Sequence, residues 1–110
     1  MNNRISKELD QYARMIFNAI SKSWKNNTAH LSSSTEIANH EDMRILLEIF
    51  GKAESLLPYI LEDMQKGSVE WVHVLPVITG ENPVSEENAG NIQKMADTWL
   101  EWGKDYLNTD

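Results

Sequence analysis

The chain has 110 residues, a formal net charge of −7 at pH 7 and no cysteine. This length supports one domain with a single core. The absence of cysteine excludes disulfides, thiolate zinc sites and thiol nucleophiles, and it is compatible with a cytoplasmic protein. Direct nucleic-acid binding is disfavoured, because phosphate contacts need clustered Lys and Arg, which are scattered here. We expect neither a signal peptide nor a membrane-spanning segment.

The first predicted element is a helix over residues 6–25. Ser6 is its predicted N-cap, and Asn26 with Asn27 is its predicted stop. Apolar residues recur along it at helical steps, namely Ile5, Leu9, Tyr12, Ala13, Ile16, Phe17, Ile20 and Trp24. We expect this stripe to lie in the core, although a helix at a chain end can also dock on another molecule.

Residues 28–35 are predicted to form a loop, since Ser and Thr side chains compete with the backbone for hydrogen bonds. Ser34 or Thr35 is expected to cap a short turn that runs to Ala38. Asn39 is the predicted cap of the next helix, which ends at Gly51 in a left-handed conformation. That helix is apolar on most sides and is therefore expected to be buried. Its apolar residues are Met43, Ile45, Leu46, Leu47, Ile49 and Phe50.

A further helix is predicted over residues 53–65, with Pro58 near enough to its start for the missing amide to cost little. Residues 69–79 are predicted to form a short helix that bends or ends near Pro76. After a turn and a helical turn opened by Ser85, a last helix runs to Leu107. The predicted fold is all-α, a compact bundle of about five helices in one domain, residues 1–110.

Several stretches together carry a resemblance: His40 before the buried helix, residues 53–61 with Pro58, Trp71, residues 78–84 (ITGENPV) and residues 99–103 (WLEWG). They resemble a group of small bacterial all-helical proteins of unassigned function with HEAT-like helical hairpins. The resemblance spans about residues 28–103 and implies stacked hairpins over 35–107, with no catalytic residues to carry over. About two hairpins are fewer than the roughly three repeats that a solenoid needs, which favours a compact bundle.

The histidines give little support to a metal site. No two of them stand at the i, i+4 spacing of a helical metal pair. Glu70 and His73 form one Glu-x-x-His unit, whereas di-metal bundles need two such units and two further carboxylates. We expect no metal and no cofactor. For a small-ligand or enzymatic site between the hairpins, the candidate residues are His40, His73 and Glu70.

Among the tryptophans, Trp24, Trp71 and Trp99 lie on predicted core stripes, whereas Trp102 falls at the edge of its stripe. Tryptophan is common in interface hot spots, so Trp102 is the candidate anchor for a partner. The full set of candidate partner-binding residues is Trp102, Glu101, Asp105, Glu86 and Glu87.

The favoured hypothesis is a non-catalytic protein-binding domain that acts on a basic protein partner, because the chain is acidic and shows no catalytic constellation. An inhibitor of the immunity-protein or antitoxin kind, or an adaptor, fits this description. The alternative is a small-ligand-binding or enzymatic domain, which requires His40, His73 and Glu70 to converge on a pocket. A third hypothesis is a homodimer built on the first helix.

Overall fold

The computed structural model describes residues 3–107, with side chains described for residues 7–105, and this part of the chain contains helices and no strand. The all-α prediction is therefore confirmed. The elements are α1 (Asn3–Thr28), α2 (Ser34–Ala38), α3 (Glu41–Phe50), α4 (Ala53–Gln65), the 3-10 helix η1 (Glu70–His73), α5 (Leu75–Thr79) and α6 (Ile92–Leu107).

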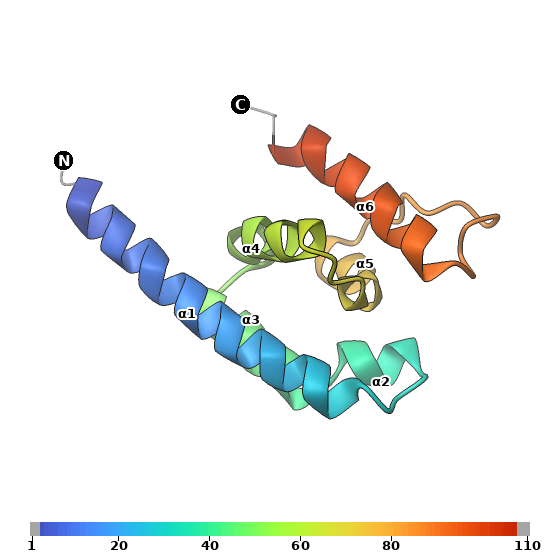
Figure 1. Cartoon of the computed structure of the whole chain (residues 1–110), viewed down its shortest axis with the longest axis horizontal. Coiled ribbons are helices and arrows are strands. Elements are labelled where there is room, and N and C mark those ends of the chain that lie inside the picture. The colour runs from blue at the N-terminus through green and yellow to red at the C-terminus, as the bar shows by residue number, and fades with distance from the viewer. Residues whose placement is uncertain (1–2, 108–110) are drawn as a thin grey trace.

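The helices form a compact bundle around α4 (Figure 1). On one side α1 packs on α3, and on the other side α4 packs on α6 and η1 contacts both α2 and α6. At 26 residues α1 is about 39 Å long, whereas α3 has 10 residues and is about 15 Å long. The shorter α3 can cover only part of α1, and the N-terminal half of α1 projects beyond α3.

The apolar stripe of α1 is consequently buried over only part of its length. In the C-terminal half, Phe17 and Trp24 are 2% and 0% exposed, as expected for core residues. In the N-terminal half, Leu9 and Tyr12 remain 63% and 64% exposed. Ile49 on the outer side of α3 is also half exposed. The expectation that the stripe of α1 lies in the core is therefore met in its C-terminal half and not at Leu9 and Tyr12.

Both predicted ends of α1 are wrong by about one turn. The helix begins at Asn3, so Ser6 lies inside it and is not its cap. Its other end is Thr28, because the Asn27 side chain donates to Ser23 Oγ and to Asp42 and leaves the backbone of α1 helical. Thr28 completes the last turn by donating to the carbonyl of Trp24 at 2.7 Å.

The short turn before Ala38 is confirmed as α2, but its cap is Ser33, whose hydroxyl accepts from the amide of Glu36. The cap of α3 is His40 and not Asn39, because the imidazole reaches the amide of Asp42. The predicted positive φ at Gly51 is confirmed, at 81°.

The bounds of α4 agree with the prediction, but Pro58 is its sixth residue and lies beyond the first turn. It therefore removes one hydrogen bond of the helix. The predicted helix over residues 69–79 is in fact two elements, η1 and α5, that meet at Val74. Pro76 is in the first turn of α5, where its missing amide needs no partner, so it begins a helix and does not end one.

The core is built around aromatic rings from four elements. Trp71 of η1 stacks on Phe17 with ring centroids 5.5 Å apart and lies 4.6 Å from Trp24. Tyr59 of α4 and Phe50 of α3 extend the cluster. The predicted burial of Trp24, Trp71 and Trp99 is confirmed, since all three are 0% exposed.

Asp63 on α4 holds the polar edge of this cluster. Its Oδ2 accepts from the Trp71 indole at 2.8 Å and from Lys25 of α1 at 2.6 Å. Lys25 also donates to Ser68 at 2.7 Å. Burial alone would raise the pKa of Asp63, but the hydrogen bonds from Lys25 and Trp71 outweigh it and hold the pKa below its ordinary value of 3.8. Asp63 therefore ties α1, α4 and η1 together.

We expect Asp63→Ala to lower the free energy of unfolding by about 2 kcal/mol near neutral pH, because Lys25 and the Trp71 indole lose their shared acceptor. The pKa of Asp63 is lower in the folded chain, so its stabilisation is full above about pH 3.8 and is lost as the pH falls through the folded pKa. Denaturant titrations across acid pH measure both effects. Asp63→Asn is the control: it keeps an oxygen for the indole and should flatten the acid dependence. If the stability of Asp63→Asn depends on acid pH as that of the native chain does, Asp63 does not have this stabilising role.

Candidate functional site

A groove with a volume of about 480 Å³ lies between α3 and α5. We call it the α5 groove. Its floor is mainly apolar, with Met43 and Leu47 from α3 facing Val74, Val77 and Ile78 from the α5 side. Val77 is 64% exposed, although it is a large apolar side chain. The groove is thus a solvent-accessible apolar surface of the kind that binds ligands or partner segments.

A second hollow, of about 300 Å³, lies beside this groove, and Ile78 lines both. We call it the Trp102 hollow, because Trp102 of α6 and Leu57 of α4 form its apolar walls. Trp102 is half-buried and lies edge-to-face on Trp99, with ring centroids 5.2 Å apart. The candidate anchor is therefore a half-buried side chain in the wall of a hollow.

The rims of the α5 groove and the Trp102 hollow carry charges of both signs. Glu48 and Arg44 line the α5 groove, and Glu54, Glu81 and Lys52 line the Trp102 hollow. Arg44 already pairs with two carboxylates of its own helix, at 3.3 and 3.7 Å. These pairs are largely exposed and contribute little to stability.

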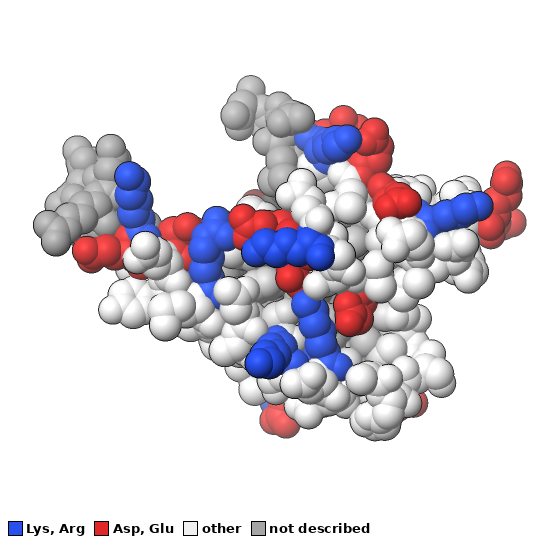
Figure 2. Space-filling view, viewed as in Figure 1, with Lys and Arg blue, Asp and Glu red and all other residues white. Residues whose placement is uncertain are grey.

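The other predicted partner-binding residues fall into two groups along the chain. Glu101 and Asp105 are exposed on the same helix, where Glu101 pairs with Lys104 at 3.4 Å. Glu86 and Glu87 are exposed in the turn that precedes α6, at the opposite end of that helix. On the face drawn in Figure 2, acidic and basic side chains are interleaved, and neither sign forms one continuous patch.

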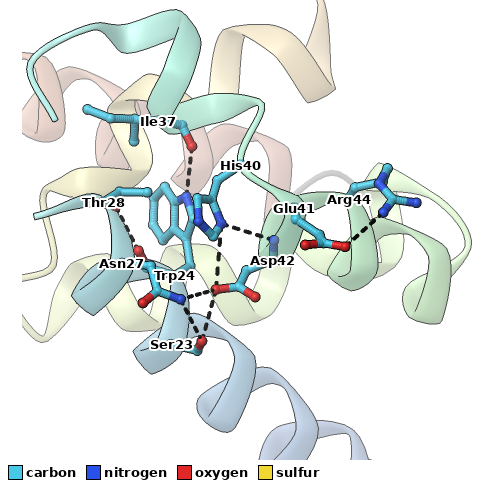
Figure 3. A network of polar contacts seen from close by, with 9 residues as sticks. All are labelled: Ser23, Trp24, Asn27, Thr28, Ile37, His40, Glu41, Asp42 and Arg44. Atoms are coloured by element: carbon cyan, nitrogen blue, oxygen red, sulfur yellow. Dashed lines mark hydrogen bonds and ion pairs between the residues drawn. The ribbon is translucent and has the colours of Figure 1, made fainter.

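His40 lies at the edge of the α5 groove, within the polar network of Figure 3. Its Nδ1 accepts from the Asp42 amide at 3.1 Å and lies 3.6 Å from the Asp42 carboxylate. That carboxylate accepts from Ser23 at 2.9 Å and from Asn27 at 3.0 Å. The network joins the end of α1 to the start of α3. His40 therefore has a structural role in capping α3, although it lies beside a groove.

His73 and Glu70 lie elsewhere, and neither lines the α5 groove. His73 shares a hydrogen bond with Ser34 of α2, with 2.8 Å between Nδ1 and Oγ. Burial lowers the pKa of His73, and the nearby charge of Glu70 only partly opposes this. The structure therefore groups His73 with Ser34, whereas His40 bonds within the network around Asp42. Nothing in the sequence spacing indicated this contact, since the two residues are far apart in the chain.

Among the residues whose side chains are described, no group of three or more His, Asp and Glu could hold a metal ion. Within the same part of the chain, no helix has the combined length and apolar character needed to cross a bilayer. No protein-family model, no curated protein and no solved structure matches the chain.

We expect His40→Ala to lower the free energy of unfolding by about 1 kcal/mol, the usual cost of losing an N-cap acceptor. His40→Asn should recover most of this loss, because Asn is a good N-cap residue. Urea denaturation with an unchanged m-value measures the difference. Equal losses for the Ala and Asn variants would argue that His40 does not stabilise the fold by capping α3.

We expect the imidazole of His73 to titrate below 6.5, the ordinary histidine pKa, in an NMR titration of the folded chain. A lowered folded pKa means that the unfolded chain binds the proton more tightly, so stability falls as the pH drops from 6.5 through the folded value. His73→Asn should remove this part of the pH dependence. A His73 pKa above 6.5 would show that Glu70 outweighs burial.

Proposed function

We propose that this chain is a cytoplasmic, non-catalytic protein-binding domain that receives a basic segment of a partner protein in the α5 groove and the Trp102 hollow. The observation that carries the proposal is that these two hollows are neighbours, with Ile78 in the lining of both. Together they offer an extended apolar floor, which suits a peptide segment better than a compact small molecule.

The chemistry of the lining indicates an amphipathic helix as the bound segment. Apolar side chains of such a helix, spaced at i, i+3, i+4 and i+7, would rest on Leu47, Val77 and Trp102. Its Lys and Arg side chains would lie toward the rim carboxylates of Glu48 and Glu54. The net charge of −7 would raise the rate of encounter with a basic partner.

Binding of this kind fits an inhibitor of the immunity-protein or antitoxin kind, or an adaptor. In either role the acidic domain would cover a basic segment that its partner uses for another contact. The residues of the groove then work by complementarity of shape and charge, and no bond of the partner is broken.

A second candidate function is the binding or conversion of a small ligand. The hydrogen bond between Ser34 and His73 favours it, because a hydroxyl beside an imidazole is the usual arrangement of an activated nucleophile. Such a site would lie at the contact of α2 with η1, where neither Ser34 nor His73 lines the α5 groove.

Affinity capture with matched baits tests the protein-binding proposal. Val77→Arg adds bulk and positive charge to the floor of the α5 groove at an exposed position, so the fold should be retained. Ile92→Arg makes the same change at the exposed start of α6, outside both hollows. We expect the native chain and the Ile92→Arg bait to capture a basic protein that the Val77→Arg bait loses.

The captured protein is then purified and titrated against the same three chains. Its affinity should fall by at least about tenfold for Val77→Arg, and by about as much when salt screens the rim carboxylates. A partner that binds all three chains equally, or whose binding ignores salt, would overturn the proposal. If Ser34→Ala abolishes binding of a ligand and Val77→Arg leaves that binding unchanged, the small-ligand function is favoured.

A further inference from the structure

We infer that the N-terminal half of α1 pairs with the same half of a second copy, forming a homodimer with two-fold symmetry. The surface concerned consists of Leu9, Tyr12, Ala13 and Ile16 of α1 with Ile49 and Phe50 of α3, and we call it the α1 patch. It shares no residue with the α5 groove or the Trp102 hollow. The pairing therefore does not rest on the function proposed for those hollows.

The α1 patch is apolar and open to solvent. Leu9 and Tyr12 are about two-thirds exposed, Ile49 is 51% exposed and Ile16 is 39% exposed. The flank of α1 that faces away from α4 in Figure 2 is mostly white along its N-terminal half, in agreement with these residues. Exposed apolar surface of this kind marks a contact with another molecule when it is continuous, as it is here.

The helix is held from its other side, so the patch is presented on a fixed support. Asp10 accepts from the Tyr59 hydroxyl of α4 at 2.6 Å and from Arg14 at 3.0 Å. Arg14 also pairs with Glu62 of α4 and lies over the Tyr59 ring. These contacts fix the projecting part of α1 against α4 while they leave Leu9, Tyr12 and Ile16 uncovered.

The shape of the patch fits a second copy of itself. A two-fold interface places the same surface on both sides, so that surface must offer both projections and a depression to receive them. The α1 patch has both: a hollow of about 220 Å³ with the small Ala13 in its lining, and the exposed side chains of Leu9 and Tyr12 beside it. Its α1 residues have the i, i+3, i+4, i+7 spacing of a helix–helix contact.

Charge also favours a second copy over the basic partner. No charged residue lines the α1 patch, so a basic segment would find no carboxylate there. Two copies that each carry −7 repel one another least where the facing surfaces are uncharged. The acidic character that would draw a basic protein to the α5 groove thus does not oppose pairing through α1.

The area is sufficient for a dimer of modest affinity. The four exposed side chains present on the order of 400 Å² of apolar surface, taking roughly 200 Å² for a fully exposed large apolar side chain. Two copies would bury about twice that area, and the polar rim would bring the total near the roughly 1,200 Å² at which specific interfaces begin.

Sedimentation velocity from about 1 µM to about 1 mM of protein tests the inference, since this range covers the dissociation constants of weak interfaces. We expect the native chain to shift from monomer to dimer as its concentration rises. Ile16→Asp should weaken the dimer by at least about 100-fold, because the symmetry buries two new carboxylates. The matched control is Ile92→Asp, at an isoleucine of nearly equal exposure on α6, 42% against 39%, which should dimerise like the native chain.

Single cysteines provide a second readout, since the chain has none of its own. Tyr12→Cys, Ala13→Cys and Ile16→Cys are oxidised in parallel with Ile92→Cys. A disulfide forms only where two Cα atoms come within about 7 Å, so the position nearest the two-fold axis should yield a covalent dimer and Ile92→Cys should not. A native chain that stays monomeric throughout, or cross-linking no faster in the α1 patch than at Ile92, would overturn the homodimer. Neither result bears on binding at Val77.

Discussion

The indole of Trp71 touches both α1 and α4, and the positions of the other elements depend on this contact. One neighbouring ring is Phe17 and another is Trp24, both from α1, while the indole N–H donates to Asp63 of α4. Asp63 in turn holds Lys25 of α1. The hydrogen bonds of Trp71, Asp63 and Lys25 form only while all three side chains stay in place, which makes the cluster a cooperative unit.

This arrangement fixes the two ends of α1 by different means. Its C-terminal half is anchored by aromatic burial and by the network around Asp42, whereas Asp10 and Arg14 hold its N-terminal half to α4 by polar contacts. A short α3 cannot cover the whole of a long α1. The exposed apolar surface is thus a consequence of unequal helix lengths, and it lies apart from the groove beside α5.

Helical periodicity was enough to predict the all-α fold, the bounds of α4 and the burial of Trp24, Trp71 and Trp99, because these depend on local pattern and on large apolar side chains. It could not show which part of an apolar stripe is covered, since that depends on the length and placement of α3. The end of α1 was also missed, because the deciding contact is tertiary: Asn27 bonds to Asp42 instead of ending the helix. For the same reason Trp102 was identified as informative, while its place in the wall of a hollow beside Ile78 was not foreseen.

The closeness of Trp24 and Trp71 has a spectroscopic consequence. Two indoles with centroids 4.6 Å apart and rings tilted by 31° share their electronic transitions, so their circular dichroism belongs to the pair. One ring comes from α1 and the other from η1, and the coupled signal exists only while these elements are in register. Near-ultraviolet dichroism depends on fixed packing of aromatic rings, so the part of it that Trp24 and Trp71 contribute reports the docking of α1 without any label.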